Sequence, residues 1–324
     1  MKKNNKILVT GGAGYIGSHV VHELCNAGHS VVVLDNLSLG RRENLAPDAT
    51  FIEGDIQNET DLEKAFKKGI DVVFHFAAWK AAGESMSDPA KYAKNNISGT
   101  ISLLNTMLKK NVEYFIFSSS AAVYGNPEYL PIDENHVLKP ANYYGYTKMA
   151  IEQNLSWYSK LKGLKYAALR YFNATGYDIN NKVNGKEKKP ANLSPVVMET
   201  CAGIREKMQV FGNDYETADG SCIRDYIHVN DLASAHLMAM DYIFKNNQNL
   251  VVNLGTGRGY SVFEVIEAAE RMSGRSVPYD IVGRREGDPQ ELIASSRLAF
   301  EKLGWKARYS DLETIFKTMA RVYL

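Results

Sequence analysis

The chain has 324 residues, of which 45% are hydrophobic and 23% are charged, so it is long and apolar enough for one large folded core or two joined ones. Its formal net charge is +1, which excludes the strong basic field that attracts nucleic acid or an anionic membrane surface. We therefore expect no nucleic-acid partner and no membrane partner, and the three widely spaced cysteines favour a cytoplasmic location over a disulfide framework.

The first residues do not have the pattern of a secretory signal. Lys2 and Lys3 precede only a short apolar run, Ile7 to Val9, whereas the hydrophobic part of a signal is longer. No segment approaches the ~20 apolar residues of a transmembrane helix. We therefore expect neither a leader nor a membrane span.

Strand-like and helix-like segments alternate through the first half of the chain. Lys6 to Thr10 is an apolar run that ends in glycines, Tyr15 to Ala27 has helical spacing, and Gly28 is placed to end that helix. Further apolar runs predict strands at Val31 to Leu34, Asp71 to Phe76, Tyr114 to Ser118 and Tyr166 to Arg170. Apolar residues at three- and four-residue spacing predict another helix, namely Ile97, Ile101, Leu104 and Leu108.

The pattern loosens after Asn173. Tyr177 to Lys189 is polar and rich in Asn and Lys, which predicts an exposed loop. Leu250 to Leu254 predicts a further strand, and Val262 to Met272 predicts an amphipathic helix.

Continuous apolar strands that alternate with helices predict an α/β fold with a doubly wound parallel sheet. We expect a nucleotide-binding domain over residues 1–173, to which the segment around 226–255 returns. Residues 174–324 are expected to form mainly a smaller, interleaved C-terminal substrate domain. The cleft between the two is the expected ligand site.

A glycine-rich loop, Thr10 to Gly17, joins the first predicted strand to the first predicted helix. Gly11, Gly14 and Gly17 suit a tight turn, a close approach of the backbone to a pyrophosphate, and close packing of the helix on the sheet. Free N–H groups at the start of that helix would face the phosphates. This context predicts a Rossmann-type dinucleotide site, and a glycine turn without a ligand is the weaker alternative.

Asp35 ends the second predicted strand, 18 residues after Gly17. An acidic side chain there can bind the adenosine ribose hydroxyls and would repel a 2′-phosphate. The pattern therefore favours NAD over NADP as the cofactor, although Arg41 and Arg42 lie nearby and weaken that inference.

Tyr144 and Lys148 lie four residues apart at the start of a predicted helix, so both side chains can face one site. A tyrosine phenol has a pKa of ~10, which is too high for a base at neutral pH. One ammonium about 4 Å away supplies about the 4 kcal/mol that lowers this pKa by ~3 units. A cationic nicotinamide ring would add to this effect, and Tyr144 could then remove a hydroxyl proton while the carbon gives hydride to NAD. Tyr143 and Tyr146 compete for this role, and an ordinary helix surface is the alternative for the pair.

Three serines, Ser118 to Ser120, follow directly on the predicted strand that starts at Tyr114. The carboxyl end of a strand in such a sheet faces the ligand crevice. A serine hydroxyl there can hydrogen-bond the reacting oxygen, and we choose Ser120 among the three.

These motifs together resemble the extended short-chain dehydrogenase/reductase family, and within it the UDP-hexose 4-epimerases, over nearly the whole chain. Strings shared with many sugar-nucleotide enzymes of that family are Val9–Gly12, Leu34–Asn36, Gly54–Ile56, His75–Ala78, Asn95–Asn96 and Leu169–Asn173. Strings closer to the epimerases are Phe211–Tyr215, Arg224–Val229, Asn253–Gly255 and Arg285–Asp288.

The resemblance implies an NAD-dependent isomerase that inverts C4 of UDP-glucose or UDP-galactose. Tyr144 would take the proton of the 4-hydroxyl while hydride moves to NAD. The 4-keto sugar would then swing about its link to the diphosphate and take the hydride back on its other face. Because no net oxidation occurs, the cofactor is expected to stay bound between turnovers. Lys148 would order the nicotinamide ribose and tune Tyr144.

The resemblance also implies which residues line the two ligand sites. The expected cofactor-binding residues are Gly11, Gly14, Tyr15, Ile16, Gly17, Asp35, Asn36, Asp55, Ile56, Phe76, Ala77, Ala78, Lys80, Asn96, Ser118, Tyr144, Lys148, Tyr171 and Phe172. The expected residues for the UDP-sugar are Ser120, Tyr144, Asn173, Asn192, Leu193, Phe211, Arg224, Tyr226, Arg285, Asp288 and Leu292. The two arginines suit a diphosphate because each guanidinium donates in a planar fork. No cluster has metal spacing, so no metal is expected.

Three positions depart from the family pattern. Asn142-Tyr143 precede Tyr144 where relatives usually have Ser-Pro or a similar pair, and the loop Asn181 to Lys189 is basic where relatives are often acidic. Leu292 falls where a residue near the sugar 2-substituent gates the pocket. A tyrosine there excludes N-acetyl sugars and a small residue admits them. Because leucine is intermediate, we hypothesise additional activity on UDP-N-acetylglucosamine and UDP-N-acetylgalactosamine.

Other enzymes of the family and a non-catalytic NAD-binding protein are the alternatives. A 4,6-dehydratase needs a carboxylate pair beside the strand-end serine, where this chain has Ala121 and Ala122. A sugar-nucleotide decarboxylase fits the C-terminal strings less well. The fold alone would permit a protein without activity, but the intact set of Tyr144, Lys148 and Ser120 argues against it.

Several other residues are expected to have structural roles only. His75 and His228 lie inside strand-like strings and are expected to be buried and hydrogen-bonded, while Trp79 and Trp157 are expected to be packing residues. The resemblance adds a homodimer, which the family commonly forms through two long helices per subunit, here about Tyr92 to Lys110 and Tyr144 to Lys162.

Overall fold

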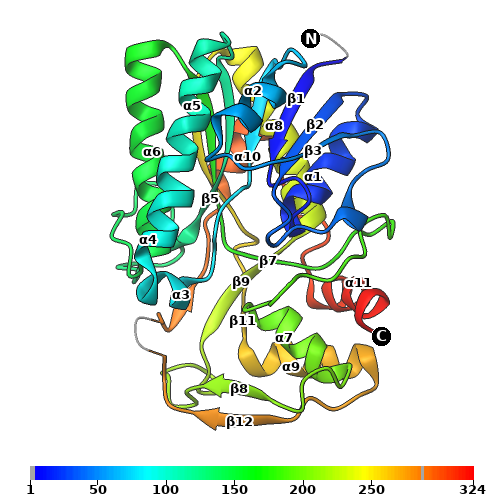
Figure 1. The fold of residues 1–324 in the computed structure, drawn as a ribbon. Coiled ribbons are helices and arrows are strands. Elements are labelled where there is room, and N and C mark those ends of the chain that lie inside the picture. The colour runs from blue at the N-terminus through cyan, green and yellow to red at the C-terminus, as the bar shows by residue number, and fades with distance from the viewer. Residues whose placement is uncertain (1–3, 286–287) are drawn as a thin grey trace.

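The computed structural model describes residues 4–285 and 288–324 (Figure 1). Lys2 and Lys3, and the Glu286-Gly287 part of the Arg285–Asp288 string, lie outside the described residues. Among the helices that the structure describes, none is both long and apolar enough to cross a membrane.

A seven-stranded parallel sheet forms the centre of the molecule and confirms the predicted doubly wound α/β fold (Figure 1). The strand order runs outward in both directions from the neighbours β1 and β4, which is the switch point where such sheets bind ligands. From one edge to the other the strands are β10 (Leu250–Leu254), β6 (Lys165–Tyr171), β5 (Tyr114–Ser120), β4 (Val72–His75), β1 (Lys6–Thr10), β2 (Ser30–Asp35) and β3 (Thr50–Glu53). The sequence pattern did not predict β3, because Thr-Phe-Ile-Glu holds only two apolar residues in a row.

Helices cover both faces of this sheet, because alternate residues of each strand point to opposite sides. Ile7 and Val9 of β1 pack in one core cluster and Leu8 packs in the other. The first face is covered by α1 (Tyr15–Asn26), α8 (Val229–Asn246) and α10 (Arg297–Leu303). The second face is covered by α2 (Glu59–Phe66), α5 (Thr100–Lys109) and α6 (Tyr143–Lys162).

The start of α6 is fixed by a cap. The Asn142 side chain accepts a hydrogen bond of 2.9 Å from the Gly145 backbone N–H, which satisfies one of the free donors at the helix start. The helix ends at Gly163, whose φ of +77° suits glycine. Asn142, which departs from the family pattern, therefore serves as the cap that places Tyr144 in the first turn.

The helix predicted from Ile97 to Leu108 has a different start. A π-helix runs from Ala93 to Gly99 and continues directly into α5. The wider turn buries both Asn95 and Asn96, and π-helical turns often occur at functional sites. Two short helices precede it, α3 (Ala82–Ser87) and α4 (Pro89–Tyr92).

A smaller part of the molecule lies beyond the carboxyl ends of the central strands (Figure 1). In it β9 (Ile223–His228) is paired by β7 (Asn173–Thr175), β11 (Gly259–Ser261) and β13 (Glu291–Leu292). A separate pair is formed by β8 (Met208–Phe211) and β12 (Tyr279–Val282). The helices of this part are α7 (Leu193–Cys201), α9 (Val262–Ser273) and α11 (Leu312–Tyr323), which share one core cluster. Residues after 173 thus supply this part and also return to the central sheet through α8 and β10.

Candidate active site

The glycine loop at the carboxyl end of β1 leaves no room for side chains. Gly11 has a φ of +74°, and a Cβ there would lie 2.5 Å from the Ala77 backbone nitrogen. A Cβ on Gly17 would lie 2.3 Å from the Gly11 carbonyl oxygen, so the first turn of α1 packs directly on the loop. The loop therefore presents bare backbone to its surroundings, as phosphate binding requires.

A cleft opens beside this loop, over the carboxyl ends of β1 to β4. Nine of the predicted cofactor residues line it, namely Gly11, Gly14, Asp35, Asn36, Asp55, Ile56, Phe76, Ala77 and Ala78. Sequence reasoning missed a further group in the lining, namely Leu34, Ser38, Leu39, Gly40, Gly54, Trp79 and Asn95. Trp79, which we expect to be a packing residue, borders the cleft as well.

Tyr144, Lys148 and Ser120 meet at the carboxyl end of β5. The Lys148 ammonium lies 5.8 Å from the centre of the Tyr144 ring and donates a hydrogen bond of 2.7 Å to the Ser118 carbonyl. Ser120 is close enough to Tyr144 to lower the pKa of its phenol. The competing Tyr146 is 44% exposed on the outer side of α6. The structure therefore groups the three residues that the sequence selected.

The electrostatics of this group differ from the prediction. Burial raises the pKa of Tyr144 to about 12, and Ser120 offsets only part of that rise. Burial also lowers the pKa of Lys148 to about 7, although the nearby Glu152 carboxylate opposes this shift. The sequence-based argument counted the charges of Lys148 and of the nicotinamide ring, and the desolvation of both side chains opposes the effect of these charges.

Four of the predicted substrate residues lie on or next to β7, β9 and α7, namely Asn173, Asn192, Leu193 and Tyr226. Asn173 is the register partner of Tyr226, and its side-chain amide donates a hydrogen bond of 2.9 Å to the Asp225 carbonyl. Asn192 precedes α7, and Leu193 begins this helix and packs against the core cluster that contains Tyr226. These four positions are therefore held by one packed unit.

Five further predicted substrate residues lie around β13 and the end of β8, namely Phe211, Arg224, Arg285, Asp288 and Leu292. The Arg224 Nη2 atom is 2.5 Å from the Asp288 Oδ1 atom, and Arg224 is the register partner of Leu292. The Arg285 guanidinium carbon lies 4.1 Å from the centre of the Phe211 ring. Both arginines are therefore oriented by neighbours.

A model described as the NAD dependent epimerase/dehydratase family matches residues 7–255. The chain belongs to this family. The UDP-glucose 4-epimerase of Halalkalibacterium halodurans is 48% identical over 310 residues, which cover 95% of this chain and 92% of the relative. The structure of UDP-glucose 4-epimerase from Brucella ovis in complex with NAD superposes with a TM-score of 0.95 at 46% identity, covering 98% of both chains. The UDP-Glc/GlcNAc 4-epimerase of Campylobacter jejuni gives a TM-score of 0.86 at 40% identity, covering 98% of this chain and 99% of that one.

The end of β2 fits the adenosine end of NAD, the cofactor of this family. Asp35 accepts backbone hydrogen bonds from Ala13 at 3.0 Å through Oδ2 and from Leu37 at 2.8 Å through Oδ1. Each carboxylate oxygen keeps the capacity for a further donor such as a ribose hydroxyl. The Asn36 side chain donates a hydrogen bond of 2.8 Å to Asp55, which connects the ends of β2 and β3 on the same side of the cleft.

The two nearby arginines are engaged elsewhere. Arg42 pairs with Glu53 at 2.6 Å, and Arg41 pairs with Glu43 at 3.3 Å and donates to the Lys186 carbonyl. In the part of the chain that the structure describes, neither guanidinium donates a hydrogen bond to Asp35. The Asp35 carboxylate can therefore still repel a 2′-phosphate, so the structure favours NAD in this family member despite the two positive charges.

The segment Tyr177 to Lys189, which we call the strap, was predicted to be an exposed loop, and this was wrong for part of it. Tyr177 and Val183 are buried, and Glu187 pairs with Lys80. The strap is also tied to the cleft residues around β2, because the Lys188 ammonium donates a hydrogen bond of 2.9 Å to the Leu37 carbonyl.

A further contact fixes the strap in the middle. The buried Asn44 accepts a hydrogen bond of 2.8 Å from the Gly185 N–H and donates one of 3.3 Å to the Gly185 carbonyl. Only glycine fits here, because a Cβ on residue 185 would lie 2.4 Å from the Asn44 Oδ1 atom. No sequence signal identifies this contact, because its partners are 141 residues apart.

The remaining predicted cofactor residues surround the cleft without lining it. Tyr15 donates a hydrogen bond to the Gly176 carbonyl, and Asn96 bonds both the Trp79 backbone and, at 3.1 Å, the Thr147 hydroxyl. The others that lie outside the lining are Ile16, Gly17, Lys80, Ser118, Tyr144, Lys148, Tyr171 and Phe172. In this group Ser118 and Tyr171 are hydrogen-bonded to each other.

The two strand-end histidines are buried and hydrogen-bonded, as predicted. His75 bonds the hydroxyls of Thr10 at 2.6 Å and Thr100 at 2.8 Å, and His228 bonds that of Thr318 at 3.2 Å. Within the described residues, no group of three or more His, Cys, Asp or Glu side chains has the arrangement of a metal site.

Proposed function

We propose that this protein interconverts UDP-glucose and UDP-galactose by inverting C4 of the sugar, with NAD held between turnovers. The observation that carries the proposal is the grouping of Tyr144, Lys148 and Ser120 at the carboxyl end of β5, in the same parallel sheet as the glycine loop. Its support comes from membership of the family and from relatives that are UDP-glucose 4-epimerases at nearly full length.

The proposed roles follow from this geometry. Tyr144 takes the proton of the sugar 4-hydroxyl and returns it after C4 has inverted, and Ser120 hydrogen-bonds the reacting oxygen. Bound NAD would supply hydride transfer from C4 and back to it, and its positive nicotinamide ring would lower the pKa of Tyr144 against the effect of burial. Lys148 holds the nicotinamide ribose and contributes its charge to the same phenol.

The diphosphate is proposed to bind between Arg224 and Arg285. A guanidinium donates in a planar fork that matches phosphate oxygens, and the two side chains come from β9 and from the segment after β12. Arg224 forms an ion pair with Asp288 at 2.5 Å, so this carboxylate sets the orientation of the Arg224 guanidinium before substrate binds. One firm link to the diphosphate would let the 4-keto sugar turn while it stays bound.

The test is incubation of the purified protein with UDP-galactose and analysis of the products by NMR. The expected result is an equilibrium mixture of UDP-glucose and UDP-galactose with no net formation of NADH. A 4-keto-6-deoxy product would favour a dehydratase. Loss of carbon dioxide from a UDP-uronic acid, offered as a second substrate, would favour a decarboxylase. No turnover of either substrate would favour a non-catalytic NAD-binding protein. Ala121 and Ala122, in the 3₁₀ turn Ala121–Val123, speak against a dehydratase because neither supplies a carboxylate.

We hypothesise a second activity on UDP-N-acetylglucosamine and UDP-N-acetylgalactosamine. Leu292 lies on β13 beside Arg224 and packs against a small apolar cluster that includes Phe172 and Ala294. A leucine is smaller than a tyrosine and would leave space at the sugar 2-substituent. A relative at 40% identity, from Campylobacter jejuni, acts on both kinds of sugar, which supports the hypothesis.

We also propose a homodimer that forms through α5 and α6. Trp157 and Leu161, two apolar residues on α6, are 58% and 65% exposed, which is unusual for side chains of this size. Assigning Trp157 to packing within the chain was therefore wrong. The mass of the particle in solution, measured by light scattering, tests this proposal, and a monomer at micromolar concentration would contradict it.

We propose that the protein works in a reducing compartment such as the cytoplasm. Cys25, Cys201 and Cys222 are all free thiols, which such a compartment maintains.

A further inference from the structure

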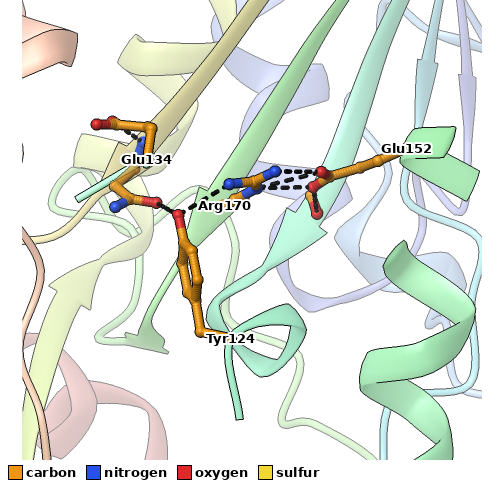
Figure 2. Close-up of polar contacts among 6 residues, drawn as sticks. Tyr124, Glu134, Glu152 and Arg170 are labelled. Atoms are coloured by element: carbon orange, nitrogen blue, oxygen red, sulfur yellow. Dashed lines mark hydrogen bonds and ion pairs between the residues drawn. The ribbon is translucent and has the colours of Figure 1, made fainter. Parts of the chain in front are cut away.

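A buried ion pair lies directly beneath the proposed catalytic residues. Tyr144, Lys148 and Glu152 occupy successive turns on one face of α6, since four residues make about one turn of a helix. Glu152 points from this helix to Arg170 on β6, and the two side chains are only 7% and 6% exposed (Figure 2).

The hydrogen bonds of this pair are well satisfied. Arg170 donates to Glu152 through Nε at 3.0 Å and through Nη2 at 2.5 Å, which is a two-point contact. Its third nitrogen donates to the Tyr124 hydroxyl at 3.0 Å, and that hydroxyl donates to Asn253 at 2.6 Å (Figure 2). The Ser119 hydroxyl completes the set by donating to the Glu152 carboxylate at 2.5 Å.

Stability alone gives a weak reason for such a pair. Removing two charges from water costs free energy that their attraction barely recovers, and packed apolar residues of similar volume are often as stable or more so. The position of the pair suggests another reason. Ser119 lies between Ser118, whose carbonyl accepts the Lys148 hydrogen bond, and Ser120 at the end of β5.

We propose that Glu152 and Arg170 are positioning residues for the epimerase reaction. Arg170 and Ser119 anchor the Glu152 carboxylate, and this anchor sets the face of α6 that carries Tyr144 and Lys148 against the serines of β5. It also fixes a negative charge one turn from the Lys148 ammonium. The inference rests on the proposed function and adds two residues that do not touch the substrate.

The charges around Lys148 make this effect specific. The titratable and charged groups that face Lys148 and the pair from the surrounding elements are His75, Tyr124, Glu134, Tyr144, Glu152, Tyr166, Arg170 and Tyr171. Burial lowers the pKa of His75 to about 3 and raises those of the tyrosines, so these groups are neutral at neutral pH. Glu152 is the carboxylate that raises the pKa of Lys148 against the effect of burial.

Replacement of Glu152 by glutamine tests the proposal, because Glu152→Gln keeps the shape and removes the charge. The pKa of Lys148 should then fall below its present value, so Lys148 loses its proton at a lower pH. If the reaction needs the ammonium, the alkaline limb of the plot of log kcat against pH moves to lower pH. We also expect kcat to fall by ~10- to 100-fold, the effect of a small misplacement of catalytic groups, with little change in KM.

The matched control is Glu134→Gln at the other end of the same hydrogen-bonded chain. Glu134 accepts from the Asn253 N–H at 2.6 Å, and glutamine can accept the same bond (Figure 2). This variant should keep the pH profile of the unmodified protein. An unchanged profile and kcat in folded Glu152→Gln would overturn the proposal, whereas an inactive unmodified protein would overturn the proposed function instead.

A double variant separates positioning from simple stability. Glu152→Met with Arg170→Met leaves no unpaired charge, so it should fold even if the single variant does not. The proposal expects a folded protein, judged by its thermal unfolding, with the same loss of kcat and a smaller shift of the alkaline limb, because the loss of the Arg170 charge offsets part of the loss of the Glu152 charge. A folded double variant with full kcat would show that the pair is structural only.

Discussion

The Lys148 ammonium donates its 2.7 Å hydrogen bond to the carbonyl of Ser118, so one side chain of α6 is fixed to the carboxyl end of β5. This contact joins the helix and the strand at the proposed reaction centre, where Ser120 also acts on the pKa of Tyr144. Tyr144 and Lys148 are both desolvated, which raises the pKa of Tyr144 and lowers that of Lys148. Burial therefore favours the neutral form of each side chain. We propose that the positive nicotinamide ring of bound NAD offsets this desolvation, which would tie catalysis to cofactor binding.

The strap should control how long NAD stays bound. Asn44→Ala removes two hydrogen bonds to Gly185 that hold the strap across the region around β2. We expect NAD to be lost at least ~5-fold faster, which corresponds to ~1 kcal/mol, the net value of one buried hydrogen bond. The measurement is the NAD content after repeated gel filtration. Asn26→Ala, which removes only an exposed contact with Lys182, is the control, and equal loss in both variants would contradict the expectation.

The glycine loop should not tolerate a methyl group at position 17. Gly17→Ala would place a Cβ 2.3 Å from the Gly11 carbonyl oxygen, so the loop or α1 must move. We expect a destabilisation of ~1–3 kcal/mol, typical of overpacking, and loss of NAD from the purified protein. Thermal unfolding and cofactor content measure the two effects. Gly83→Ala has no atom within 4 Å of the added Cβ and should change neither.

The residue at position 292 should set the preference between hexoses and N-acetylhexosamines. Leu292→Tyr fills the space that an acetamido group would need. We expect the ratio of kcat/KM for UDP-N-acetylglucosamine to that for UDP-glucose to fall by ~10-fold or more, as steric pocket changes of this size give. Leu292→Ala should raise the same ratio. Ratios that do not respond to either change would remove Leu292 from the specificity site.

Stability should fall in mild acid because several imidazoles are buried in neutral form. Burial lowers the pKa of His19 and of His236 to about 4, and those of His75 and His228 to about 3. The unfolded chain takes up protons below a pH of ~6.5 while the folded chain does not, so the free energy of unfolding decreases as pH falls from ~6.5 toward ~4.

His236 offers a direct check of this sign. Its ring packs against Phe74 and Phe76, so His236→Phe should fit the site and remove one titrating group. The slope of the unfolding free energy against pH between ~6 and ~4.5 should decrease by ~1.4 kcal/mol per pH unit. Urea unfolding at a series of pH values measures the slope, and an identical slope in both proteins would count against the buried neutral imidazole.

The sequence predicted the parts of the site that are encoded by local spacing. Gly11 and Asp35 lie in one βαβ unit, and Tyr144 and Lys148 lie four residues apart, so the chemistry of each group is visible in a short window. Six of the seven strands of the central sheet were predictable for the same reason, since each is a continuous apolar run, and β3 was the exception.

The parts that could not be predicted depend on contacts between distant segments. Asn44 meets Gly185, and Arg170 meets Glu152 across β6 and α6, and no spacing rule connects such pairs. The π-helix before α5 was hidden because Ile97 and Ile101 also fit α-helical spacing. The rise in the pKa of Tyr144 could not be predicted either, because its cause is burial, which is not visible in a sequence.

The most direct test of the account is the turnover of UDP-galactose by Tyr144→Phe, with NAD content measured on the same sample. The account predicts that the variant keeps its NAD and fold but loses ~10²–10⁴-fold in kcat, the usual contribution of a general base. Tyr146→Phe, which changes an exposed phenol on the same helix, should keep full activity. A Tyr144→Phe protein that holds NAD and turns over UDP-galactose at the rate of the unmodified protein would contradict the account.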